Sequence, residues 1–113
     1  MNPQFNDEFN EAVKNIGLTG DAYAIAKSKS WLLQELKGSM LAQLMRETGS
    51  EKISRSEMIA RSSTQYRDFL DGVSEAIKQE LLAKGQYERS RAEFEKLRSL
   101  CSLEKSTQKE IGI

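Results

Sequence analysis

The sequence contains no histidine and a single cysteine, so two common catalytic side chains are missing or almost missing. Without histidine, neither a Ser-His nor a Cys-His nucleophile pair can form within one chain. Cys101 has no second cysteine with which to form an intramolecular disulfide. We therefore expect a non-catalytic protein that holds no cofactor and no metal ion.

The sequence also lacks a long apolar run and a net charge. No window approaches the ~20 consecutive apolar residues that a membrane span requires, and the first residues do not resemble a signal peptide. Lysine plus arginine total 17 and aspartate plus glutamate total 17, so no overall field attracts nucleic acid or an anionic membrane. These features predict a cytoplasmic protein without a membrane partner.

The composition that remains is typical of long helices. A length of 113 residues suits one domain, which would span residues 1–113. The apolar fraction of 38% and the charged fraction of 30% fit helices that each bury only one stripe. We expect an all-α, elongated helical hairpin or bundle.

The first half of the chain predicts two helices separated by a break. Pro3 fits the first position of a helix, and Gly17 can adopt the left-handed conformation that ends one, so a short helix is expected at about 3–16. A cap at Thr19 or Asp21 would start a long second helix at about 21–47, and Gly49 would end it.

Residues 50–70, "SEKISRSEMIARSSTQYRDFL", have the outline of a helix-turn-helix motif. A short amphipathic helix containing Met58 and Ile59 is expected at about 55–61. Two segments, 54–57 and 62–65, fit the pattern of a capping box, which explains the break without a DNA-binding role. We interpret the stretch as an elbow between long helices. The alternative is a small nucleic-acid-binding protein whose candidate contacts are Lys52, Arg55, Arg61 and Arg67.

The strongest pattern is a seven-residue repeat in the second half of the chain. Positions spaced by three and four from Tyr66 to Glu104 are mostly apolar or small, which predicts a coiled-coil-like helix at about 65–105. The register stays in phase across Gly72 and Gly85, so neither glycine need end the helix. Residues 106–113 lack the repeat, and we expect a frayed tail there.

A helix of about forty residues is roughly 60 Å long, and the expected second helix cannot cover all of it. The part near Tyr87, Phe94 and Leu97 would then have no partner within the chain. We therefore predict a homo-oligomer, a protein partner, or both. The predicted interface residues are Tyr66, Phe69, Val73, Ala76, Ala83, Tyr87, Phe94, Leu97 and Cys101.

Two further features have structural interpretations. The basic series at 84, 91, 98 and 105 would resemble a nucleic-acid track, but Glu88 and Glu95 are interleaved and neutralise it. Trp31 and Tyr23 are expected to be core or interface anchors, because no basic groove with interleaved aromatic residues surrounds them.

The segments "EMIARSSTQYRDFLDGVSEA" and "YERSRAEFEKLRS" resemble small all-helical accessory proteins encoded by temperate phages. The resemblance implies a non-enzymatic factor that acts on a phage or host protein in the bacterial cytoplasm, for example as an inhibitor of a host protein. It transfers no functional residue to this chain, and it is compatible with DNA association as well.

Overall fold

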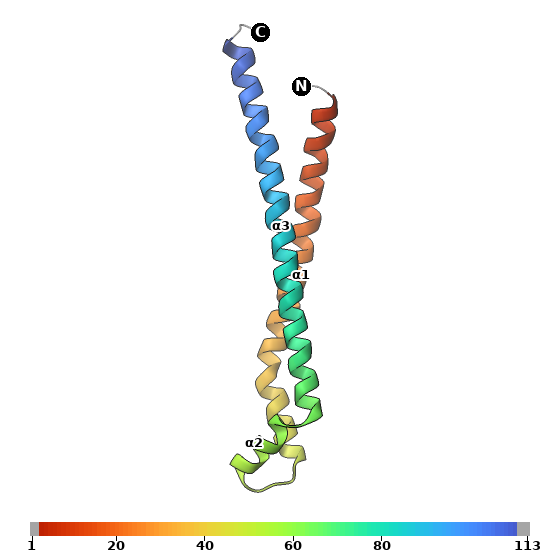
Figure 1. The fold of residues 1–113 in the computed structure, drawn as a ribbon, viewed down its shortest axis with the longest axis vertical. Coiled ribbons are helices and arrows are strands. Elements are labelled where there is room, and N and C mark those ends of the chain that lie inside the picture. Colours follow the sequence, from red (N-terminus) through yellow and green to blue (C-terminus); the bar gives the residue numbers. More distant parts are fainter. Residues whose placement is uncertain (1–2, 111–113) are drawn as a thin grey trace. The chain divides into compact units, whose positions relative to one another are not determined.

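The computed structural model describes residues 3–110, with the side chains of 108–110 left aside, and contains three helices in this range. They are α1 (Pro3–Glu47), α2 (Ile53–Arg61) and α3 (Thr64–Glu110), and no strand is present among the described residues (Figure 1). The all-α helical hairpin expected from the sequence is confirmed. Helix α3 continues beyond its expected end near residue 105, and residues 111–113 of the predicted frayed tail lie outside the described range.

Contacts group the chain into two compact units. Unit 1 combines the first part of α1, as far as Ala24, with α3 from Leu82 onward. Unit 2 is the continuous segment Ile25–Leu81, which contains the rest of α1, all of α2 and the beginning of α3.

Unit 2 has its core where its three helical segments meet. Leu44 of α1, Ala60 of α2 and Tyr66 of α3 are buried together. The partly buried side chains around them are Met40, Leu41, Met45 and Leu70. Because each helix contributes one buried residue, the packing of α2 depends on both long helices.

The packing between α1 and α3 in unit 2 includes one fully buried polar residue. Ser30 has a relative exposure of 0%. The Gln34 side chain donates hydrogen bonds to the Ser30 hydroxyl at 2.9 Å and to its carbonyl at 3.2 Å. A buried hydroxyl is tolerated when it is hydrogen-bonded in this way.

Unit 1 is held together by pairs of aromatic rings. The Phe9 and Phe94 ring centroids are 5.5 Å apart, and those of Tyr23 and Tyr87 are 6.0 Å apart. An earlier residue of α1 therefore meets a later residue of α3, so the two segments are antiparallel. The expectation that residues 87–101 have no partner within the chain is wrong, because the first part of α1 covers them.

The predicted break between helices 3–16 and 21–47 is also wrong, since α1 is continuous. Gly49 is the glycine with a positive φ among the described residues, at 69°, and it follows the end of α1 as expected. Thr19 does not cap a helix; its hydroxyl donates to the Asn15 carbonyl at 2.7 Å within α1. A Cβ atom added to Gly20 would lie 3.2 Å from Cε1 of Tyr87, so this glycine serves close packing instead of a turn.

The seven-residue repeat explains why α1 continues. Positions at alternating spacings of three and four are buried or half-buried along α1 from Phe5 to Leu44, with Lys37 as the exposed exception, and Ile16, Thr19 and Tyr23 carry the repeat across the two glycines. On α3, all twelve repeat positions from Tyr66 to Glu104 are buried or half-buried. The face predicted for the long helix is therefore confirmed, and α1 supplies the matching face within each unit.

Candidate interaction surfaces

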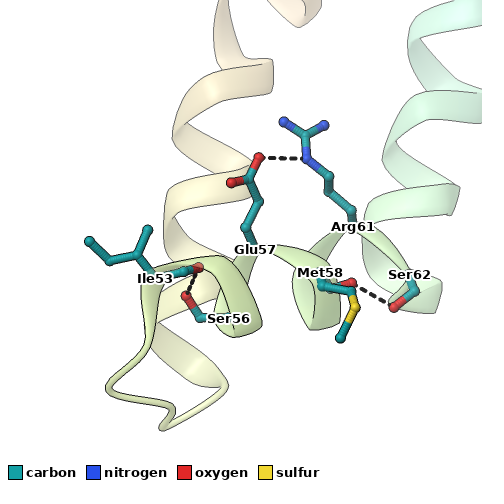
Figure 2. A network of polar contacts seen from close by, with 6 residues as sticks. All are labelled: Ile53, Ser56, Glu57, Met58, Arg61 and Ser62. Atoms are coloured by element: carbon teal, nitrogen blue, oxygen red, sulfur yellow. Dashed lines mark hydrogen bonds and ion pairs between the residues drawn. The ribbon is translucent and has the colours of Figure 1, made fainter.

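Helix α2 begins earlier than its sequence signals suggest. Its N-cap residue is Lys52, whose side chain makes no capping hydrogen bond. Ser54 lies inside the first turn, so it cannot cap the helix, and the predicted capping box at 54–57 does not form. The nearby Ser56 hydroxyl instead donates to the Ile53 carbonyl at 2.9 Å (Figure 2).

The start of α3 is capped one residue later than predicted. The backbone N–H of Tyr66 donates to the Ser63 hydroxyl at 3.2 Å, which is the contact expected of an N-cap serine. Ser62 faces back toward α2, where its hydroxyl donates to the Met58 carbonyl at 2.7 Å. The short connection between α2 and α3 is therefore fixed by side-chain bonds on both sides.

Helix α2 buries its small residues and exposes its large apolar ones. Ala60 and Ser56 are 1% and 5% exposed, whereas Met58 is 66% exposed and Ile53 is 75% exposed. Figure 2 shows Met58 pointing away from the two long helices. Small inward residues let α2 approach the long helices closely, and the larger side chains are left on the surface.

Two of the four candidate nucleic-acid contacts lie together. Arg61 and Arg67 line one open hollow beside Met58, while Lys52 and Arg55 are exposed outside that lining. The Arg61 Nε atom donates to Glu57 Oε1 at 2.9 Å. Exposed pairs of this kind contribute little to stability. The hollow thus gathers two cations, one of which already has a carboxylate partner.

The residues predicted to form an oligomer interface lie on the face of α3 that packs against α1 or α2. Tyr66, Val73, Ala76 and Leu97 are buried, and the other five are half-buried. Contacts inside each unit account for this burial. Their participation in an intersubunit contact stays a prediction. The original reason for it, that no part of the chain would cover these residues, does not hold.

The charged flank of α3 forms fewer contacts than the sequence suggests. Arg98 Nη1 lies 3.7 Å from Glu95 Oε1, and the Arg91 guanidinium lies 5.8 Å from the centroid of the Tyr87 ring. Both arginines therefore interact with neighbours on their own helix. This supports the interpretation of the basic series as a solvated flank of the helix.

A surface that the sequence reasoning missed lies on α1 in unit 2. We call it the outer face of α1, formed by Ile25, Ser28, Trp31, Leu32 and Leu36. Trp31 is 62% exposed and Ile25 is 71% exposed, so Trp31 is not the core anchor that was one of its expected roles. Lys27, Ser28, Trp31 and Leu32 line an open hollow on this face.

A sequence signal for this surface does exist. Ile25, Leu32 and Leu36 recur at helical spacing as a second apolar stripe, beside the stripe that packs against α3. In the continuous helix α1 the two stripes differ in burial: the stripe that packs against α3 is mostly buried or half-buried, and the second stripe is exposed.

Exposed apolar side chains outnumber the buried large ones in the described part of the chain. Thirteen large apolar residues are exposed, whereas the buried large ones are Leu44, Tyr66, Val73 and Leu97. Single exposed apolar residues are ordinary, but several gathered on one helix face indicate a contact surface. The outer face of α1 meets that description.

Other kinds of site receive no support from residues 3–110. Within that range no helix is both long and apolar enough to cross a membrane. Among the side chains that the structure describes, those of residues 3–107, no group of three or more His, Cys, Asp or Glu is placed to hold a metal ion. The observed class is an all-α protein built on a helical hairpin. Comparisons with protein-family models, curated proteins and solved structures find no match to the chain.

Proposed function

We propose that this chain is a non-catalytic helical interaction protein that binds another protein through exposed apolar side chains. The observation that carries the proposal is the outer face of α1, where Ile25, Trp31 and Leu32 are each more than half exposed. Burying such residues contributes about 25 cal/mol per Å² of apolar surface. Tryptophan is also enriched among the residues that dominate binding energy at interfaces.

The resemblance to phage accessory proteins gives this proposal a biological setting. In that setting the protein acts in the bacterial cytoplasm and its partner is a phage or host protein. The balanced charge of the chain supports contact through apolar surface rather than attraction to a highly charged polymer.

A pull-down with a matched control tests the proposed function. Tagged full-length protein is incubated with untagged protein in a nuclease-treated bacterial lysate, and retained proteins are identified by mass spectrometry. We expect a retained protein, either a host protein or the untagged copy, that is lost with Trp31→Ala plus Leu32→Ser. The control is Leu103→Ser, which alters a leucine of unit 1 that is also exposed. Absence of any retained protein, or equal retention by the α1 variant, would contradict the proposal.

A second candidate function is nucleic-acid binding at the corner around α2. The observation in its favour is that Arg61 and Arg67 line the same hollow. A gel-shift series at low salt should then show binding that weakens steeply as salt increases. Arg61→Ala plus Arg67→Ala should abolish the shift, while Lys84→Ala plus Lys96→Ala removes the same charge from exposed sites of unit 1 and should preserve it. If no shift occurs at low salt, this candidate is rejected.

A further inference from the structure

We propose that the outer face of α1 pairs with the same face of a second copy of the chain, with the two α1 helices antiparallel about a twofold axis. The inference rests on the proposed function and specifies both the surface and the partner. Three features of residues 25–36 support it, namely a hollow with a matching side chain, a common register for the apolar residues, and complementary charges.

One of the residues that line the hollow on this face is small. Ser30 is fully buried, and a helix turns by about 100° per residue, so Ser28 lies on nearly the opposite side of α1. Lys27, Trp31 and Leu32 line the hollow together with Ser28, which is the smallest of the lining residues. An exposed leucine from another helix can insert into such a space, as knobs insert into holes in coiled coils.

Leu32 is the side chain that matches this hollow, and its placement sets a register for the whole face. With Leu32 of each copy inserted over Ser28 of the other, an antiparallel arrangement also brings Ile25 opposite Leu36. Both pairs fit the same register. In two antiparallel helices, the residue numbers of facing residues have a nearly constant sum, and the two pairs share nearly the same one. Ile25, Leu32 and Leu36 therefore each gain an apolar or small partner in one arrangement.

The same register brings opposite charges together. Lys27 of one copy faces Glu35 of the other, and the twofold axis repeats this contact at the other end. A parallel arrangement would instead place Lys27 beside Lys27 and Glu35 beside Glu35, which is unfavourable. Complementary flanking charges set orientation in paired helices, and a self-complementary patch is what a twofold dimer requires.

The area of the patch predicts a weak association. Stable interfaces bury about 800 Å² on each partner, more than the few side chains of this face can provide. The exposed tryptophan in the patch is the type of residue that contributes most per interface position. We therefore expect a dimer whose population depends on protein concentration.

Sedimentation equilibrium of the full chain from micromolar to millimolar concentration tests the proposal. We expect a reversible monomer–dimer equilibrium. Leu32→Glu should lower the association constant by about tenfold or more, and Leu103→Glu, which places the same charge on an exposed position of unit 1, should leave it unchanged. Circular dichroism confirms that each variant is helical before it is compared.

Charge reversal tests the register. Lys27→Glu and Glu35→Lys should each weaken the dimer, because each creates like-charge contacts across the twofold axis. The double variant restores opposite charges and should recover most of the association. If Lys27 and Glu35 contributed only to the stability of α1 in a monomer, neither single change would alter the dimer population. There would then be no loss of association for the double variant to recover.

The outcomes separate this inference from the proposed function. A chain that remains monomeric throughout the concentration range overturns self-pairing, and so does a dimer that is insensitive to Leu32→Glu. If the monomeric chain still retains a host protein through Trp31 and Leu32, the proposed function survives and its partner is a different protein. If neither association is observed, both ideas are wrong.

Discussion

Replacing Gly17 by alanine would show directly whether α1 is continuous. The sequence alone predicts a helix end at this position, where glycine would adopt a left-handed conformation. In the structure Gly17 lies in the interior of α1 without a positive φ, and a Cβ atom added there would meet no atom within 4 Å. The two descriptions predict opposite signs for the change in stability.

The expected magnitude follows from the helix propensity of the two residues. In a continuous helix, Gly17→Ala should raise the free energy of unfolding by about 0.5–1 kcal/mol, mainly because alanine loses less backbone entropy on folding. The corresponding increase in Tm is about 2–5 °C for a chain of this length. At a left-handed helix end, alanine would instead cost roughly 1–2 kcal/mol.

Urea unfolding followed by circular dichroism at constant protein concentration measures the change. Constant concentration matters because self-association would add to the apparent stability. Gly49→Ala is the matched control, since Gly49 has φ of 69° and alanine there should lower stability by about 1 kcal/mol. If Gly17→Ala and Gly49→Ala destabilise the protein by similar amounts, the continuous α1 is refuted.

Three further predictions test the packing. Ala60→Leu should cost about 1–3 kcal/mol by overpacking the contact of α2 with the long helices, and a thermal melt with unchanged Tm would contradict this. In urea unfolding, Ser63→Ala should lower the free energy of unfolding by about 1 kcal/mol, while Ser54→Ala should be nearly neutral. The reverse order would support the capping box predicted at 54–57. Phe94→Ala should cost about 2 kcal/mol through its lost contact with Phe9, and hydrogen exchange should accelerate in unit 1; unchanged exchange there would argue against the docking of α1.

The long-range repeat was the most predictive part of the sequence. It correctly identified the packed face of α3, including polar positions such as Ser90 and Glu104, because periodicity depends on many residues and tolerates individual exceptions. Local signals were less reliable. Serines occur in sequence at both 62 and 63, and only the observed hydrogen bond shows that Ser63 is the cap.

The sequence by itself determined the helical class, the elbow between long helices and the inward face of α3, because the spacing of apolar residues constrains each of them. Only the tertiary structure decided that residues 3–47 form one helix. Gly20 packs against the ring of Tyr87, and this contact cannot be inferred from local sequence because the two residues are distant along the chain. Tertiary packing also decided that α2 faces inward with Ala60 and outward with Met58. The exposure of Trp31 was likewise decided by tertiary packing, because α3 packs against the opposite side of α1 and leaves the outer face exposed.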